Sequence, residues 1–189
     1  RMETSVPDIY AVGDAVEVTH FVTGQKVLIS LAGPANKQGR IAADNICGGN
    51  SRFTASQGSA VLKLFGLTAA FTGINEKAAQ AAGIAYDKVV LFPASHAAYY
   101  PGAQSMAMKV LYEKESLRLL GAQIVGGDGV DKRIDVLATA IRAKMTALEL
   151  TELDLSYAPP YSSAKDPVNM AGFMIEDLES GKVRQFHWN

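Results

Sequence analysis

Alternation of apolar and polar residues is strongest in the middle of the chain. Residues 105–113 place Met106, Met108 and Val110 on one face, and residues 117–125 resume the alternation after a short polar break. Two neighbouring stretches with a period of two predict a β-hairpin. Further strands are predicted at residues 9–12, 59–65 and 88–92. The segments beyond residue 50 therefore predict an antiparallel sheet.

Apolar residues spaced three and four positions apart predict helices beside this sheet. Ile134, Leu137 and Ile141 form such a stripe after a glycine-rich turn, and Asp131 is the expected cap. The other predicted helices are Asn75–Gly83 with an asparagine cap, a short helix opened by the capping box Thr146–Glu149, and a terminal helix begun by Asp166 and Pro167. The predicted fold class is α+β, with an antiparallel sheet flanked by helices.

The first fifty residues have a different character. Strand 9–12 ends at Gly13 and Asp14, an arrangement that suits binding of a sugar hydroxyl at the edge of an α/β sheet. The following segment predicts a helix with a face of small residues, Ala35, Gly39, Ala42, Ala43 and Ile46. Such a face predicts close packing on a neighbouring element.

The composition changes near residue 50, which predicts a domain boundary there. Residues 1–50 are then the end of an α/β domain, residues 51–172 the sheet domain, and residues 173–189 the end of the last helix and a lead-in to another domain. The chain starts at Arg1 without a signal-peptide pattern, so we expect it to be part of a longer protein.

Charge and cysteine content limit the possible partners. Eighteen basic and 19 acidic residues give a net charge of -1, which disfavours nucleic acid and anionic membranes as partners. No apolar run reaches the roughly 20 residues of a membrane helix. A single cysteine excludes an internal disulfide framework and fits a reducing compartment, so a cytoplasmic location is expected.

Few residues have the surroundings that catalysis or metal binding requires. Cys47 is predicted at a helix C-terminus, where the helix dipole disfavours a thiolate. The glycine-rich segment 126–129 lacks the Lys-Ser/Thr of a phosphate-binding loop. His20 and His187 have no partners at ligand spacing, so no metal site is predicted.

Two loops combine tyrosines with prolines that stiffen the backbone. They are HAAYYPG at residues 96–102 and YAPPYSSAK at residues 157–165. Rigid aromatic loops often line binding sites, but tyrosines also pack beneath proline rings simply for stability. Both interpretations remain open from the residues alone.

A known family shares several of these stretches. The pattern T-S-x-P-x-I-Y-A-x-G-D at residues 4–14 resembles the second flavin motif of the pyridine nucleotide-disulfide oxidoreductases. The rest resembles their C-terminal interface domain. The segments PANKQGR, HAAYYPGA, GGDGVDKRIDVLATAI and YAPPYSSAKDPVNMAG most resemble the coenzyme A-disulfide reductase branch, and the ending KVRQFHW resembles the lead-in to a rhodanese domain.

The resemblance implies the C-terminal part of a reductase that uses FAD and NAD(P)H to reduce coenzyme A disulfide or persulfide. Residues 1–50 would end the FAD-binding domain, and residues 51–172 would form the interface domain of a homodimer. Two alternatives stay open: an NADH oxidase, peroxidase or polysulfide reductase on the same scaffold, and a non-catalytic dimerisation module. The apolar hairpin and the Ile134 helix are expected to supply the dimer surface.

The resemblance also assigns roles to individual residues. Gly13 and Asp14 would hold the ribitol of FAD, and the helix beginning at Leu31 and Ala32 would point at the flavin pyrimidine. Tyr99 and Tyr157 would reach the partner's active site as catalytic groups. The expected coenzyme A contacts are Lys165, Asn36 and Gln38, the last two on the exposed side of their helix.

Overall fold

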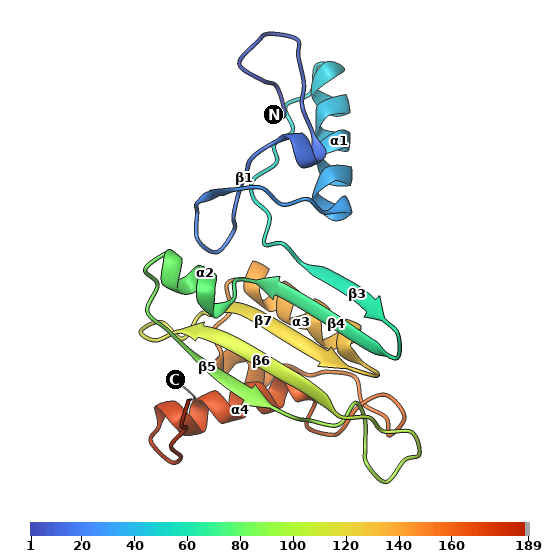
Figure 1. Ribbon diagram of the computed structural model, residues 1–189, viewed down its shortest axis with the longest axis vertical. Helices are drawn as coiled ribbons and strands as arrows, with labels where there is room; N and C mark the ends of the chain where they lie inside the picture. Colours follow the sequence, from blue (N-terminus) through green and yellow to red (C-terminus); the bar gives the residue numbers. More distant parts are fainter. Residues whose placement is uncertain (188–189) are drawn as a thin grey trace. The chain divides into compact units, whose positions relative to one another are not determined.

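The computed structural model describes residues 1–187 and divides the chain into two units, residues 1–58 and the residues from Ser59 onward (Figure 1). The boundary between the units follows Gly58, whereas the change in composition predicts a domain boundary near residue 50. Within the described residues, no helix has the length and apolar character needed to cross a membrane.

The first unit contains little sheet. Its elements are the 3₁₀ helix η1 (Gly13–Ala15), strands β1 (Val18–Thr19) and β2 (Lys26–Val27), and helix α1 (Ala32–Ile46). The predicted strand at residues 9–12 is wrong, because only Tyr10 pairs, in an isolated bridge with Glu3. A lone two-stranded ribbon is marginally stable, so this segment stays irregular apart from that bridge.

The buried face of α1 matches the predicted one only in part, through Ala42. Its buried residues are Gln38, Ala42 and Asn45, while Ile46 is 64% exposed. Asn45 explains part of the difference, since its amide nitrogen donates to the carbonyl oxygens of Arg1 at 2.7 Å and Ser51 at 3.0 Å. Polar groups that bond to the backbone, rather than the small-residue face, therefore fix this helix.

The second unit is built on a five-stranded antiparallel sheet in the order β3-β4-β7-β6-β5. Its strands are β3 (Ala60–Leu64), β4 (Leu67–Gly73), β5 (Tyr86–Leu91), β6 (Met106–Glu113) and β7 (Leu119–Gly126). The predicted strands at 59–65 and 88–92 and the predicted hairpin are confirmed. Strand β4 was not predicted, although it lies between β3 and β7.

The helices of this unit mostly follow the predicted caps. They are α2 (Glu76–Ala81), α3 (Val130–Arg142), the 3₁₀ helix η2 (Leu148–Glu152) and α4 (Pro167–Glu179). Asn75 caps α2 and Asp166 caps α4, each accepting a backbone N–H. The Thr146–Glu149 capping box forms, but it opens the 3₁₀ helix η2. Asp131 does not cap α3, because the cap position belongs to Gly129 at φ 69°.

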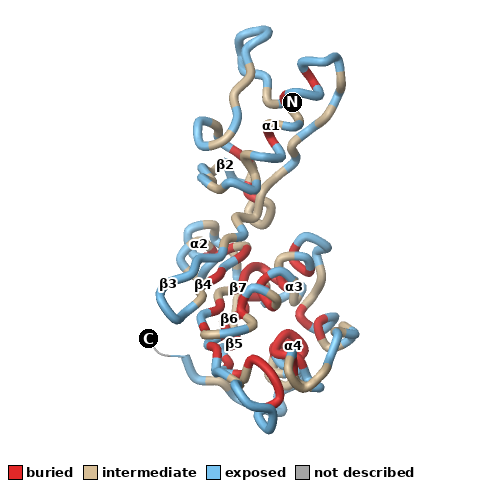
Figure 2. The backbone as a smooth tube through the Cα atoms, turned by 90° about the vertical axis from the view of Figure 1, so that its right-hand side faces the viewer, coloured by how far each residue is buried: buried red, intermediate tan, exposed pale blue. Residues whose placement is uncertain are grey.

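The core lies between the sheet and helices α3 and α4, which cover the same face (Figures 1 and 2). Met106, Met108 and Val110 are at most 1% exposed, and Leu137 on α3 is fully buried. The expectation that this hairpin and this helix face supply the dimer surface is therefore wrong, because the two elements cover each other.

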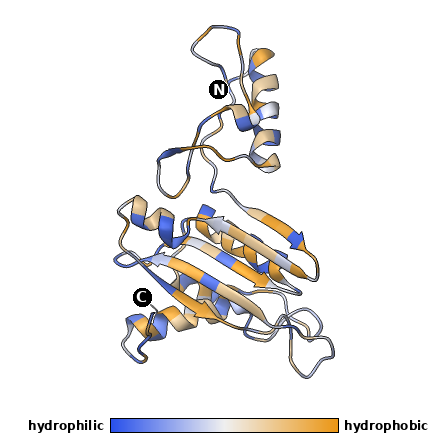
Figure 3. Ribbon diagram, in the orientation of Figure 1, coloured by the Kyte–Doolittle hydropathy of each residue, from blue (hydrophilic) through white to orange (hydrophobic). Residues whose placement is uncertain are grey.

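The opposite face of the sheet carries exposed apolar side chains instead. Cross-strand register places Leu62, Ala69 and Val125 in one row of this face, and Phe71 lies in the next row. Leu62 is 51% exposed, Phe71 45% and Val125 44%. Apolar residues run along these strands in Figure 3. No helix of the described second unit shields these side chains from solvent.

Candidate functional site

The fold brings the two aromatic–proline loops together at one end of the second unit. Tyr99 comes from the loop between β5 and β6, and Tyr157 from the loop between η2 and α4. Their hydroxyl oxygens lie 3.0 Å apart, within hydrogen-bonding distance. Tyr99 is 76% exposed and Tyr157 46% exposed. The pair thus presents two linked hydroxyl groups at the surface.

This contact changes the acidity of Tyr157. The hydrogen bond to Tyr99 raises the pKa of the Tyr157 hydroxyl above its ordinary value of 10.0. Neutral Tyr157 can donate this hydrogen bond and its phenolate cannot, so the bond favours the protonated form. Tyr157 is consequently a proton donor, and not a base, at neutral pH.

A backbone hydrogen bond joins the two loops, and a ring contact stabilises the first of them. The N–H of Ala97 donates to the carbonyl oxygen of Ser162 at 2.9 Å, which links one loop to the other. The buried His96 ring packs edge-on against Tyr100, with 5.8 Å between ring centroids. Tyr100 therefore packs on its own loop, and does not join the hydroxyl pair.

A buried arginine lies at the base of both loops. Arg133 on α3 is 1% exposed, and its Nη2 donates to the carbonyl oxygen of Ser95 at 2.8 Å and to Ser162 Oγ at 3.2 Å. The same nitrogen lies 3.1 Å from Asp166 Oδ2. The sequence contained a signal that this arginine is buried, because Arg133 falls between Val130 and Leu137 on the apolar stripe of the helix.

Asp166 is the acidic member of this cluster. Burial opposes ionisation, but the hydrogen bonds from Ser162 and from the N–H of Val168, and the charge of Arg133, lower the pKa of its carboxyl overall. The N–H of Val168 donates to Oδ1 at 3.0 Å, so one carboxylate caps α4 and neutralises the arginine. The cluster is thus a charged pair with its main acceptors satisfied.

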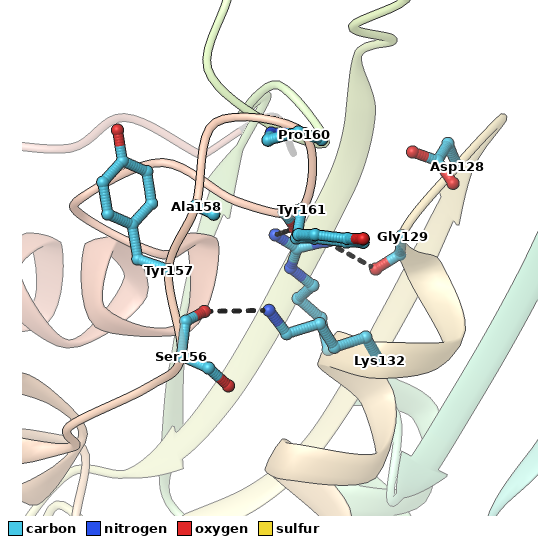
Figure 4. Close-up of a pocket in the computed structure, with 9 residues that line it drawn as sticks. Asp128, Gly129, Lys132, Ser156, Tyr157, Ala158, Pro160 and Tyr161 are labelled. Atoms are coloured by element: carbon cyan, nitrogen blue, oxygen red, sulfur yellow. Dashed lines mark hydrogen bonds between the residues drawn. The ribbon is translucent and has the colours of Figure 1, made fainter.

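A cavity of about 640 Å³ lies beside Tyr157 (Figure 4). Its lining includes Lys132, Ser156, Tyr157, Pro160 and Tyr161. The ammonium of Lys132 donates to the Ser156 carbonyl oxygen at 3.4 Å, and Figure 4 shows the Tyr157 hydroxyl pointing away from Lys132. The cavity therefore has a cationic wall and aromatic walls next to the tyrosine pair.

Lys165, the residue expected to bind substrate, lies just before the cap of α4. Its side chain is exposed, and it forms neither a hydrogen bond nor an ion pair with residues 1–187. It is not among the residues that line the cavity. The charge of Lys165 is consequently available to a ligand at the protein surface.

The residues expected to bind flavin lie at η1 and at the start of α1, in the first unit. Asp14 and Ala32 are exposed, and Leu31 occupies the cap position of α1 without a side-chain cap bond. The N–H groups of Ala32 and Gly33 therefore have no side-chain acceptor from the cap residue, whose carbonyl oxygen accepts the N–H of Ala35 at 3.2 Å. Gly13 has φ 72°, a conformation that favours glycine, and an added Cβ would meet nothing closer than 3.7 Å.

The expectation for Gln38 is wrong. Its side chain is 1% exposed, and Oε1 accepts the N–H of Gly13 at 2.7 Å. Gln38 lies on the buried face of α1 with Ala42, four residues later, so it cannot contact a substrate at the surface. Asn36, by contrast, is exposed as expected.

The remaining candidates are Cys47, the histidines and the ending of the chain. Cys47 is exposed at the C-cap of α1, as predicted. Among the described residues, no cluster of three histidine, cysteine or acidic side chains could hold a metal ion. Of the ending KVRQFHW, Trp188 lies outside the described residues, and Gln185 and His187 bond to β5 through Lys88 and Asp87.

Comparison with known proteins identifies the family. A family model described as the dimerisation domain of pyridine nucleotide-disulphide oxidoreductases matches residues 59–167. The chain belongs to this family. The expected resemblance and the expected fold, an interface domain with an antiparallel sheet flanked by helices, are therefore confirmed.

Several pyridine nucleotide-disulphide oxidoreductases are similar over most of the chain. Coenzyme A disulfide reductase of Staphylococcus haemolyticus (strain JCSC1435) is 38% identical over 179 residues, which are 94% of this chain and 40% of that protein. The solved structure of reduced Bacillus anthracis CoADR-RHD is 50% identical with a TM-score of 0.93, and the match covers 98% of this chain and 33% of that one.

A third similar protein is named for a different substrate. The NAD-dependent persulfide reductase from A. fulgidus is 45% identical with a TM-score of 0.96, and the match covers 98% of this chain and 34% of that one. The chain thus spans well under half the length of each of these three relatives.

Proposed function

We propose that the chain is the C-terminal part of a flavoprotein that uses FAD and NAD(P)H to reduce coenzyme A disulfide or persulfide. The observation that carries this proposal is the exposed pair of hydrogen-bonded hydroxyls, Tyr99 and Tyr157. The similarity to a coenzyme A disulfide reductase and to a persulfide reductase supports the substrate class.

The tyrosine pair supplies a proton to the leaving thiolate. Reduction of one disulfide by NAD(P)H consumes a hydride and a proton and yields two thiols. Tyr157 is protonated at neutral pH, since even the ordinary tyrosine pKa of 10.0 lies well above 7 and that of Tyr157 is raised further, and Tyr99 is bonded to it at 3.0 Å. General acids of this kind contribute about 10²-fold or more to a rate.

The start of α1 and the adjacent η1 fit the binding of FAD. The first turn of α1 has no side-chain cap, so the N–H groups of Ala32 and Gly33 and the positive end of the helix dipole are offered to a ligand. The N–H of Leu31 donates to the carbonyl oxygen of Ile29. The exposed carboxylate of Asp14 can accept a hydrogen bond from a ribitol hydroxyl. The N–H of Gly13 already donates to Gln38, so it is not available to FAD. The role of Gly13 is to shape the turn before Asp14. Bound FAD would carry electrons from NAD(P)H to the substrate.

Coenzyme A carries several phosphates, so its site requires fixed positive charge. Lys165 is exposed and forms no ion pair with the described residues, which leaves its charge for a phosphate. Asn36, the other expected coenzyme A contact, is exposed in the first unit. Lys165→Met is expected to raise the KM for coenzyme A disulfide and to leave the KM for NAD(P)H unchanged.

Two chains form the functional assembly in this proposal. The tyrosine loops lie at the surface, where each pair can enter the partner's active site, and the matching family model describes a dimerisation domain. Two-fold symmetric dimers are the commonest homo-oligomers, and in them each chain can offer the same loops to the other. A cytoplasmic location accords with the single cysteine, which is an exposed free thiol.

Turnover of the full-length parent protein tests the proposal. NADH or NADPH is supplied with coenzyme A disulfide, coenzyme A persulfide, glutathione disulfide, polysulfide or oxygen as the oxidant, and released thiol and consumed oxygen are measured. A coenzyme A substrate is expected to give the highest kcat/KM. A higher kcat/KM with oxygen, polysulfide or glutathione disulfide would contradict the proposal.

A further inference from the structure

We propose that Arg133 is the positioning residue of the tyrosine pair. Together with Asp166 it joins the bases of the two aromatic–proline loops, and this junction keeps the hydroxyls of Tyr99 and Tyr157 within hydrogen-bonding distance. The inference rests on the proposed function only for its catalytic consequence, because the geometric claim concerns this chain alone.

The guanidinium contacts both loops close to their tyrosines. Its Nη2 donates to the carbonyl oxygen of Ser95, four residues before Tyr99, at 2.8 Å. The same nitrogen lies 3.4 Å from the carbonyl oxygen of Tyr161, four residues after Tyr157. A single side chain on α3 therefore fixes both loops relative to one helix.

The tyrosine rings themselves are poorly enclosed. Tyr99 is 76% exposed and Tyr157 46% exposed, so packing of the rings does little to set the distance between their hydroxyls. The loop bases must then set that distance. Apart from the tyrosine bond itself, both loops are connected in the described chain by Arg133 and by the Ala97–Ser162 backbone bond. Displacements of about 1 Å at a catalytic group can reduce a rate 10²-fold.

The junction has the burial and the pairing that a rigid element requires. The side chains of Arg133 and Asp166 are 1% and 4% exposed, and their atoms lie 3.1 Å apart. Buried charges remain ionised only when they are paired and hydrogen-bonded, so neither group can rotate out without a large cost. Ser162 Oγ donates to the same Asp166 oxygen at 2.6 Å. This bond connects the loop at residues 157–165 with the Arg133–Asp166 ion pair.

The backbone of α3 approaches one side of the guanidinium closely, while the guanidinium also borders the cavity beside Tyr157. Nη1 donates to the carbonyl oxygen of Gly129 at 3.1 Å, and a Cβ added at Gly129 would lie 2.2 Å from that nitrogen. The planar fork of arginine can reach several acceptors at fixed angles, whereas lysine has a single ammonium. All contacts with the loops come from Nη2, and Nη1 bonds to Gly129. Arg133→Lys thus keeps the charge, but its single ammonium on a shorter side chain cannot replace both nitrogens at these positions.

Titration of the tyrosines in this chain tests the inference without catalysis. Tyrosine labelled with ¹³C at Cζ is followed by NMR against pH, and Tyr157→Phe assigns the Tyr157 signal. Tyr99→Phe removes the hydrogen bond and gives the full decrease in the pKa of Tyr157. In Arg133→Lys the pKa of Tyr157 is expected to fall by more than half of that decrease. The control is Arg142→Lys at the end of the same helix, which should leave the pKa unchanged.

A second variant covers the case in which Arg133→Lys does not fold. Ser162→Ala removes one acceptor of Arg133 and is expected to lower the pKa of Tyr157 in the same direction by a smaller amount. A folded Arg133→Lys or Ser162→Ala chain with an unchanged Tyr157 pKa would overturn the inference.

Kinetics of the parent protein separate this inference from the proposed function. Arg133→Lys is expected to reduce kcat for disulfide reduction about 10-fold, with an unchanged KM for NAD(P)H. Combined with Tyr99→Phe it should add little further loss, because both changes break the same contact. If the pKa shift occurs and the parent reduces no coenzyme A substrate, the positioning role holds and the proposed function fails.

Discussion

The hydroxyl oxygens of Tyr99 and Tyr157 lie 3.0 Å apart, although the two residues are 58 positions apart in the chain. One hydroxyl donates to the other, so the pair keeps a single proton free for a third group. Because both rings are exposed, that proton faces solvent or a bound molecule and not the core of the domain. The pair is therefore a surface proton donor.

Removal of one hydroxyl should affect one half-reaction only. In the full-length parent, Tyr157→Phe or Tyr99→Phe is expected to slow disulfide reduction about 100-fold, because the leaving thiolate loses its acid. Flavin reduction by NAD(P)H should keep its rate, since the tyrosines serve the second substrate. Stopped-flow absorbance measures the two steps separately.

Tyr86→Phe is the matched control for this experiment. Tyr86 lies on β5, outside both loops, and its hydroxyl bonds to Gln80 and Glu76. Both half-reactions should proceed normally in this variant. Unchanged disulfide reduction in Tyr157→Phe and Tyr99→Phe would refute the role of the pair.

Flavin binding should be weak in the isolated chain. Of the expected flavin contacts, the chain contains Gly13, Asp14 and the start of α1, which together form a small part of a cofactor site. We expect little or no FAD to copurify or to bind on titration. Absorbance near 450 nm and flavin fluorescence provide the measurement, and a stoichiometric flavin spectrum would show that these contacts suffice.

Much of the sheet could be predicted from the sequence, because alternation marks strands with one buried face. Strands β6 and β7 show this clearly. Strand β4 was missed because its side chains at Thr68, Ala69 and Ala70 are small and show little alternation of apolar and polar residues. It becomes a strand through pairing on both sides, where Ala70 faces Val61 and Ile124. Such long-range pairing leaves little trace in the local sequence.

The candidate site was predictable only in part. The prolines and tyrosines of the two loops marked them as rigid aromatic segments, but no local pattern shows that Tyr99 and Tyr157 meet. Gln38 was misplaced because a long polar side chain normally favours solvent, whereas here it bonds to the backbone of Gly13. Arg133 was missed because its acceptors come from loops distant in sequence.

The ion cluster around Glu76 should make stability depend on acidity. Burial would raise the pKa of this carboxyl, but hydrogen bonds from Lys109 and Lys88 dominate and lower it from 4.5 to about 2. A lowered carboxyl pKa stabilises the fold above the unfolded value near 4.5, and the contribution is lost as the pH falls toward 2.

Substitution of Glu76 tests this dependence. Glu76→Gln is expected to lower the free energy of unfolding by about 1 kcal/mol at neutral pH, since solvent screens a partly exposed cluster. The difference from wild type should shrink as the pH approaches 2. Urea denaturation measures it, with the exposed Glu115→Gln as a control. A difference that stays constant across this range would contradict the assignment.

The isolated chain should form a dimer, although not through the predicted surface. Met108 is fully buried between the sheet and its helices, so it belongs to the core and not to an interface. Met108→Ala should then lower the free energy of unfolding by about 2–5 kcal/mol, the usual cost of removing a core methionine. It should not change the dissociation constant of the folded dimer.

Light scattering at micromolar concentration decides the oligomeric state. The expected mass is that of two chains, each of 20.1 kDa, for the wild type and for folded Met108→Ala. The second unit contains the whole segment matched by the dimerisation-domain model, residues 59–167, so the contacts needed for association should be present. A single-chain mass that does not change with concentration would mean that association requires parts of the parent protein outside this chain. A dimer lost only in Met108→Ala would instead place Met108 at the interface.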